Sequence, residues 1–258
     1  FLERTVGDRL RTHVLSATRG IVVLSQEGKV RWSQGGPGRK IPVSVIPQIS
    51  PWPLADLPAT LAVASDRPAF LFLGNLSPEK GLDTLLEAFA RVLRTREDAR
   101  LDLAGNPALL CEESRQWWAS FRRTLETPPW QGRVRLAGYL PDGEIPAYAA
   151  REALPLFVFP MLQDRTASVS SPLLTAMYWG QAIITTPVRG HGEDIVHAQT
   201  GWLVPPRDPA ALAEAMETLL RDPDLRQRLA AAARAHFLDH HTPEQVAGRM
   251  AAVYREMR

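Results

Sequence analysis

A glycine-flanked turn with a lysine is the first stretch whose residues could bind an anion. Residues 74–81 read GNLSPEKG and stand between an apolar run and a helical pattern. Gly74 would let a ligand approach the backbone, and Lys80 could hold a phosphate as a point charge. The basic residues are otherwise almost all arginine, which makes a lysine here notable. The same spacing is equally typical of a plain strand-to-helix turn with a surface lysine.

A second candidate stretch runs from Phe157 to Gly190. Its pattern is an apolar run, a polar loop, a short helical segment and another apolar run, which predicts strand, loop, helix and strand. Ser171 suits the cap of this helix and Pro172 its first position. We expect the N–H groups of Leu173 and Leu174 to bind a phosphate, because unpaired amides and the helix dipole both favour an anion.

Other reactive residue types lack the partners that their chemistry would need. His236 and His240 are four residues apart, but neither they nor His241 come with a third ligand, so we predict no metal site. The serines of residues 168–171 have no nearby His–acid pair, which argues against a hydrolase. A single cysteine, Cys111, excludes an internal disulfide.

The candidate residues need a scaffold, and the hydrophobic pattern predicts one of alternating strands and helices. Such alternation indicates an α/β domain with a parallel sheet, whose ligand lies beyond the carboxyl ends of the strands. The turns that carry Asn106, Tyr139 and Leu140 therefore join the search. The predicted strands are residues 69–73, 101–104, 134–136, 156–159, 182–185 and 201–204. The predicted helices begin at Ser77, Glu112, Glu144, Ser171, Asp208, Asp222 and Thr242.

Composition excludes several classes of protein. The 258 residues are 45% hydrophobic and 22% charged, as in an ordinary globular chain. A formal charge of +2 without a basic run argues against a nucleic-acid partner. No apolar stretch reaches the roughly 18 residues of a membrane span, and no signal-peptide pattern opens the chain. We expect a cytoplasmic protein with further residues upstream of Phe1; attachment to the inner face of the membrane stays open.

The first 50 residues predict too little structure for a core of their own. One helix (Phe1 to Ala17) and two short strands (Ile21 to Leu24, Val43 to Ile46) bury little surface alone. Ser50 to Pro68 is rich in proline and reads as a linker. We therefore expect two parts, residues 1–50 and 51–258, the first of which belongs to a larger sheet or packs on the second. Its apolar surface could also support a homo-oligomer.

The order of motifs from residue 69 onward resembles one enzyme family. The segments read LGNLSPEKGLDTLLEAF, LAGN, VRLAGYLP, FVFP, GQAIITTPVRG and TGWLVPPRDPAALAEAM, and an amphipathic helix closes the chain. They resemble the C-terminal half of a GT-B glycosyltransferase, nearest to family 4. The resemblance implies a Rossmann-like parallel sheet with helices on both faces. It also implies a retaining, metal-independent transfer from a nucleoside-diphosphate sugar, without a cofactor.

The resemblance places donor-binding groups on the turns after the strands. In the family the first turn carries an arginine and a lysine that bind the donor diphosphate. Lys80 matches the lysine, whereas Asn75 replaces the arginine and loses its charge. Asn106 and Tyr139-Leu140 match positions that flank the nucleotide base. Tyr139 is equally typical of an aromatic side chain that covers a strand end.

The second stretch departs from the family. Its members carry two glutamates eight residues apart, the first near the donor sugar and the second on the ribose hydroxyls. Thr175 stands at the second position and Ala167 at the first. A longer loop could bring Asp164 to the first position, but Asp164 could equally be a solvated loop residue. Arg189 could supply the charge that the first turn lacks, or it could be a surface arginine.

Our hypothesis is that residues 51–258 are the donor-nucleotide half of a glycosyltransferase and residues 1–50 a remnant of its acceptor half. Lys80 and Asp164 are the candidate catalytic residues; sugar, base and acceptor stay open. The partners would be the nucleoside-diphosphate sugar and the rest of the N-terminal half. A catalytically silent module that binds a partner is the main alternative, and a nucleotide-sugar epimerase of the same fold is a third. The candidate donor-binding residues are Gly74, Asn75, Lys80, Asn106, Tyr139, Leu140, Ser171, Leu173, Leu174, Thr175 and Arg189.

Overall fold

The structure is a computed structural model that describes residues 17–34, 41–49, 68–152, 156–162, 170–188 and 190–256. The predicted N-terminal helix and the predicted linker lie almost wholly outside these residues. Within the described ranges, no helix is long and apolar enough to cross a membrane.

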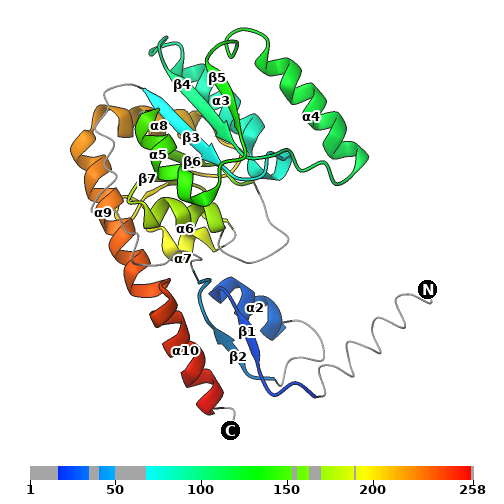
Figure 1. The fold of residues 1–258 in the computed structure, drawn as a ribbon, viewed down its shortest axis with the longest axis vertical. Coiled ribbons are helices and arrows are strands. Elements are labelled where there is room, and N and C mark those ends of the chain that lie inside the picture. The colour runs from blue at the N-terminus through cyan, green and yellow to red at the C-terminus, as the bar shows by residue number, and fades with distance from the viewer. Residues whose placement is uncertain are drawn as a thin grey trace.

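A six-stranded sheet forms the centre of the molecule (Figure 1). Its order is β5-β4-β3-β6-β7-β8, and every neighbouring pair is parallel. The chain thus enters in the middle, builds outward to one edge, and then returns to build the other side. The strands are β3 (Ala69–Leu73), β4 (Arg100–Ala104), β5 (Val134–Gly138), β6 (Leu156–Phe159), β7 (Ala182–Thr185) and β8 (Trp202–Leu203).

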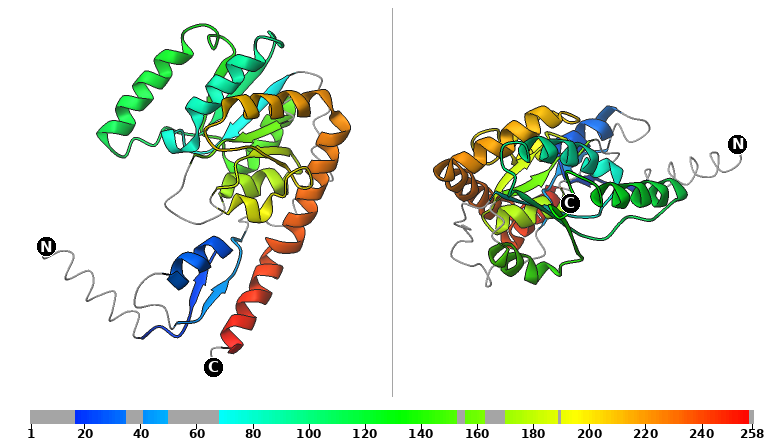
Figure 2. Two further views of the ribbon diagram at one scale, coloured as in Figure 1. Left: turned by 180° about the vertical axis from the view of Figure 1, so that it is seen from behind. Right: turned by 90° about the horizontal axis from the view of Figure 1, so that it is seen from above.

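Helices cover both faces of this sheet, which confirms the predicted α/β fold (Figures 1 and 2). One face packs against α3, α4 and α8, and the other against α5, α6 and α9. The helices on the sheet are α3 (Leu82–Val92), α4 (Glu112–Leu125), α5 (Ile145–Arg151), α6 (Ser171–Tyr178), α7 (His191–Asp194), α8 (Pro209–Arg221) and α9 (Pro223–His240), and α10 (Pro243–Glu256) follows. Two short 3-10 turns, η3 (Pro78–Lys80) and η4 (Asp142–Glu144), precede α3 and α5.

The central strand β3 shows why the sheet is covered on both sides. All of its residues are buried, and they alternate between the two faces. Phe70 and Phe72 belong to the core under α3 and α8, whereas Leu71 and Leu73 belong to the core under α5, α6 and α9. A continuous apolar run of this kind is typical of a parallel strand between two helical layers.

Local capping signals set where the helices α8 and α9 begin. The Asp208 carboxylate accepts hydrogen bonds from the N–H groups of Ala210 and Ala211, at 3.0 and 2.9 Å. Asp222 accepts one from Leu225 N–H at 2.8 Å. Each aspartate precedes a proline at the first helical position, as the sequence predicted.

A smaller unit lies beside the C-terminal helix α10 (Figures 1 and 2). It consists of β1 (Ile21–Val23), α2 (Gln26–Gln34) and β2 (Val43–Val45), and β1 and β2 pair in parallel. Both strands were predicted, but α2 was not, because its sequence QEGKVRWSQ has no apolar stripe. The structure stabilises its start by capping bonds, including one from Gly28 N–H to Ser25 Oγ at 3.0 Å.

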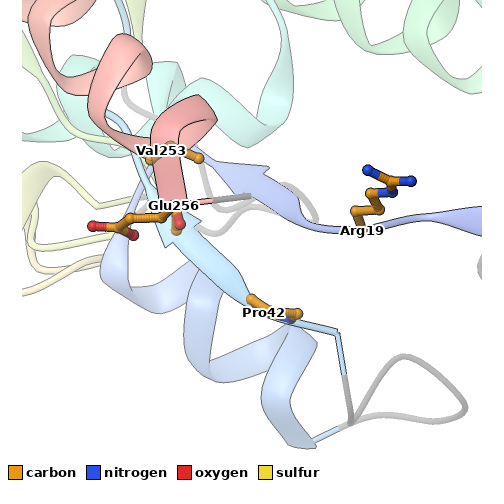
Figure 3. A pocket seen from close by; sticks show the side chains of 5 residues that line it. Arg19, Pro42, Val253 and Glu256 are labelled. Atoms are coloured by element: carbon orange, nitrogen blue, oxygen red, sulfur yellow. The ribbon is translucent and has the colours of Figure 1, made fainter. Parts of the chain in front are cut away.

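An open cleft of about 550 Å³ separates this small unit from the end of α10 (Figure 3). Arg19 and Pro42 line it on the side of the small unit, and Val253 and Glu256 on the side of the helix. Its lining residues belong neither to the main sheet nor to the turns after its strands.

Two strand ends of the main sheet come together so closely that only glycine fits. At Gly105, which follows β4, φ is +138°, and an added Cβ would lie 1.9 Å from the carbonyl oxygen of Gly74, which follows β3. An L side chain would therefore be strained and would also collide with backbone.

We predict that Gly105→Ala lowers the free energy of unfolding by roughly 3 kcal/mol, because overpacking and backbone strain add. Urea unfolding followed by circular dichroism measures it. Gly132→Ala is the matched control: its φ is +72°, but nothing lies within 4 Å of the added Cβ. That variant should lose only about 1 kcal/mol. Equal losses in the two variants would show that the close approach costs nothing.

Candidate functional site

A cavity of about 290 Å³ lies at the carboxyl ends of β3, β4 and β5, against the start of α6. β3 and β6 are neighbours in the sheet, but the helices that follow them pack on opposite faces. Such a switch point opens a crevice, and ligands of doubly wound sheets bind there. The residues that line it are Leu73, Gly74, Asn75, Gly105, Asn106, Tyr139, Leu140, Ser171, Pro172 and Thr175.

The floor of the cavity is made of turns that continue the sheet. Gly74 N–H donates to Ala104 O at 2.9 Å, and Gly105 N–H donates to Gly138 O at 2.7 Å. Leu76 N–H donates to Asn106 O at 2.9 Å. These bonds hold the turns side by side, so the candidate residues on them face one ligand-sized space.

A buried charged network anchors the turn that carries Tyr139 and Leu140. The Asp102 carboxylate in β4 is fully buried and accepts hydrogen bonds from Arg135 in β5 and from the hydroxyl of Tyr148 in α5. Burial, and the hydrogen bond to Asp102, raise the pKa of Tyr148, so its hydroxyl stays a donor. Because this network holds the elements on both sides of the turn, it fixes the cavity wall there. Tyr139 itself is 65% exposed at the rim.

The start of α6 forms the opposite wall. Ser171 is exposed there, and Gln48 Nε2 donates a hydrogen bond to its hydroxyl oxygen at 2.9 Å. Thr175 is buried one turn later, and its hydroxyl donates to Ser171 O at 3.0 Å. The position that holds a glutamate in the resembling family thus carries a hydroxyl that is already bonded within the helix.

The amides predicted to hold a phosphate are already engaged. Leu173 N–H and Leu174 N–H both donate to Ser170 O, at 2.9 and 3.3 Å, and both side chains are buried in the core. These bonds leave the two amides less available to an anion than the sequence suggested. Ser171 remains the exposed hydroxyl at this helix start.

Some predicted site residues lie elsewhere. Lys80 is half-buried in η3 and is not among the residues that line the cavity. Its turn packs closely on the loop after β6: an added Cβ at Gly81 would lie 1.8 Å from Pro160 O, and Leu162 N–H donates to Glu79 O at 3.1 Å. Asp164 and Arg189 lie outside the described residues, so their roles stay predictions.

Two adjacent acids of α7 bind elements on either side of it: Glu193 bonds to the smaller unit and Asp194 to two histidines near the end of α9. Glu193 accepts hydrogen bonds from Gln26 N–H at 2.8 Å and Glu27 N–H at 3.0 Å, and so caps α2. Asp194 accepts from His241 Nε2 at 2.9 Å and from His236 Nε2 at 3.3 Å. Burial alone would raise the pKa of Asp194, but the hydrogen bonds and charges of the two histidines outweigh it and hold the pKa to about 2.

The sequence did not identify every residue of the site. Leu73 and Pro172 also line the cavity. Gln48 contacts one of its lining residues, Ser171, from 123 residues away in sequence. A lone glutamine in the mostly apolar segment IPVSVIPQI carries no signal for such a contact. Only the fold brings it to Ser171.

Comparison with known proteins identifies the family. The glycosyl transferases group 1 family matches residues 56–236 of the chain. The chain belongs to this family. It is 31% identical over 188 residues to glycogen synthase of Mycobacterium tuberculosis, which covers 71% of the chain and 41% of that enzyme. It is 26% identical over 193 residues to the alpha-D-kanosaminyltransferase of Streptomyces kanamyceticus, which covers 74% of the chain and 46% of the relative.

Solved structures agree with the fold. Anabaena HepE in complex with UDP-glucose superposes with a TM-score of 0.75 at 20% identity, over 96% of this chain and 67% of that one. Sucrose-phosphate synthase of Thermosynechococcus elongatus gives 0.75 at 23% identity, over 96% and 61%. At such identities the likeness shows the GT-B fold alone. The chain spans about half the length of the curated relatives that it matches.

The depressed pKa of Asp194 predicts a stability that depends on acid pH. Its folded pKa of about 2 lies below the ordinary 3.8, so its contribution is present above pH 3.8 and disappears as pH falls through about 2. Across that window the difference in unfolding free energy between wild type and Asp194→Asn should shrink by about 2 kcal/mol. Urea unfolding at a series of pH values measures it.

Thr200→Val is the matched control for this titration. The Thr200 hydroxyl donates to the backbone oxygen of Asp194 at 3.1 Å and does not titrate in this range. Loss of the Thr200 hydroxyl should lower the free energy of unfolding by the same amount at both ends of this pH range. A constant difference for Asp194→Asn as well would show that the carboxylate gains nothing from the histidines.

Proposed function

We propose that this chain is the donor-binding half of a family 4-like glycosyltransferase that transfers a sugar, with retention, from a nucleoside-diphosphate sugar. The observation that carries the proposal is the cavity at the switch point, with glycine-lined backbone on one wall and a helix start on the other. A volume of about 290 Å³ is near the lower limit for small-molecule sites, so it suits the nucleotide portion of such a donor. The HepE structures with UDP and UDP-glucose support the same ligand class.

In the proposed reaction the protein works by electrostatics. The leaving diphosphate gains charge as the bond to the anomeric carbon breaks, and groups fixed in advance stabilise that charge. The exposed hydroxyl of Ser171 is such a group and lines the cavity. Lys80 and Arg189 would add positive charge, and the exposed ring of Tyr139 would stack on the base. Asp164 would lie near the sugar.

The small unit is evidence for the proposal that the protein has a second half. Parallel sheets are normally covered on both faces and contain more than two strands. The β1–β2 pair is a two-stranded parallel sheet, and Val22 and Leu24 remain 38% and 39% exposed. We propose that residues 1–50 end an N-terminal acceptor domain and that residues 51–258 are the donor domain. A cytoplasmic location and a homo-oligomer remain predictions.

A catalytically silent binding module is the alternative, and one observation favours it. Thr175 replaces the glutamate that holds the ribose in the resembling family, and its hydroxyl is bonded to Ser171 O. A nucleotide would then lack that anchor. Binding experiments separate the two functions.

We predict that the chain binds at least one of UDP, GDP and ADP in isothermal titration calorimetry. Tyr139→Ala should weaken the binding about tenfold, as expected for loss of base stacking. Lys80→Ala should also weaken it about tenfold, as expected for loss of a charged phosphate contact.

Matched controls are available for both substitutions. Tyr254→Ala removes a tyrosine that is 62% exposed on α10, and Lys29→Ala removes an exposed lysine of α2. Neither should change the dissociation constant. Absence of binding by the wild-type chain to all three nucleotides would favour the silent module.

We also predict that this 258-residue chain alone transfers no sugar, because the acceptor groups would lie in the other half. Release of UDP from UDP-glucose, with a panel of sugar and lipid acceptors, measures transfer by a coupled assay. Turnover above the level of a Lys80→Ala control would contradict the proposal that the acceptor groups lie in the other half of the protein.

A further inference from the structure

Gln48 joins the cavity to the rest of the chain through two hydrogen bonds. Its side-chain Nε2 donates to Ser171 Oγ at 2.9 Å, across 123 residues of sequence. Its backbone oxygen accepts from His241 Nδ1 at 3.0 Å, across 193 residues. The segment that leaves β2 is therefore fastened both to the start of α6 and to the end of α9.

The ring of His241 lies between two hydrogen-bond acceptors. It is fully buried, with Gln48 O at its Nδ1 and Asp194 Oδ1 at its Nε2. Both partners are acceptors only, so the ring serves as the donor in these contacts.

The other groups that face His241 come from α9. The ring centroids of His236 and His240 lie 6.0 and 6.5 Å from its own, and His236 Nε2 bonds to the same oxygen of Asp194. The ring of Phe237 stacks on it at 5.9 Å. Through these contacts His241 holds Gln48 O in one place.

The bond from Gln48 also orients the hydroxyl of Ser171. A hydroxyl has a single proton and two lone pairs, and here the amide of Gln48 occupies one lone pair. The proton of Ser171 must therefore point away from Gln48. Because Ser171 is exposed and lines the cavity, its O–H can donate to an anion bound there.

We propose that Gln48 is a positioning residue for the nucleotide diphosphate: held by the Asp194–His241 pair, it turns the Ser171 hydroxyl into the cavity as a donor. This inference rests on the proposed function, because the anion is the diphosphate of the donor. It also gives the segment after β2 a direct effect on the affinity of the donor site.

A double-mutant cycle tests the coupling. UDP affinity is measured by calorimetry for wild type, Gln48→Ala, Ser171→Ala and the double variant. Each single substitution should weaken UDP binding about fivefold, as for one hydrogen bond of ordinary net strength, and the double variant should be no weaker than either. Independent, multiplying losses would overturn the proposal, and so would an unchanged affinity in Gln48→Ala.

Two substitutions of His241 separate positioning from packing. The Asn side-chain amide can reproduce the Nδ1–H donor to Gln48 O, whereas the Gln amide reproduces the Nε2–H donor to Asp194. Both should lower the melting temperature by similar amounts. Only His241→Gln should weaken UDP binding as Gln48→Ala does. Equal affinities in the two variants would overturn the proposal.

A further arm covers two other outcomes. Asp194, His236 and His241 place one ligand atom each within 4.8 Å of one another, so equimolar Zn²⁺ is added. A rise in melting temperature that His241→Gln abolishes would assign the cluster to a metal instead.

If the wild-type chain binds no nucleotide, the proposed function fails. Hydrogen exchange of the amides of α6 then tests whether Gln48 holds the start of this helix in place. Faster exchange in the first turn of α6 in Gln48→Ala would support the proposal that Gln48 positions Ser171, and unchanged exchange would overturn it.

Discussion

The cavity depends on one topological constraint: β3 and β6 lie side by side, but their following helices leave toward opposite faces of the sheet. No side chain is needed to open a crevice at such a point. The close contact between Gly105 and Gly74 then brings the strand ends together, and the Asp102 network fixes the neighbouring turn. A ligand would therefore meet mainly backbone and hydroxyl groups held by the sheet.

The corner at α7 links this site to the smaller unit. Glu193 caps α2, and the next residue, Asp194, is bonded to two histidines of the α9–α10 corner. One of these histidines holds Gln48, which in turn bonds to Ser171 at the cavity. Both parts of the chain thus meet through hydrogen bonds that include charged groups. Such contacts fix a geometry more than they add net stability, because burying each charge costs solvation.

The site also differs from that of the family it resembles in a consistent direction. By the resemblance in sequence, Asn75 would stand for an arginine and Thr175 for a glutamate, so neutral groups would replace charged ones. Among the described residues, the polar side chains that line the cavity are all neutral: Asn75, Asn106, Tyr139, Ser171 and Thr175. If a nucleotide binds there, its affinity depends on how well these groups are oriented, since few full charges contribute.

The sequence alone determined what depends on near neighbours in the chain. The strands Ala69–Leu73 and Ala182–Thr185, the helix Glu112–Leu125 and the Asp-Pro helix starts were all predicted, because hydrophobic periodicity and capping are local signals. The turns with Gly74, Asn106 and Tyr139 were correctly placed at one edge by the parallel topology.

Only the tertiary structure decided which donors and acceptors meet. It gave α2 its cap from Glu193 and brought Gln48 to Ser171. A hydrogen bond between residues more than a hundred positions apart leaves no trace in local pattern. Its energy depends on where the sheet and helices set both groups, and the folded chain alone fixes that.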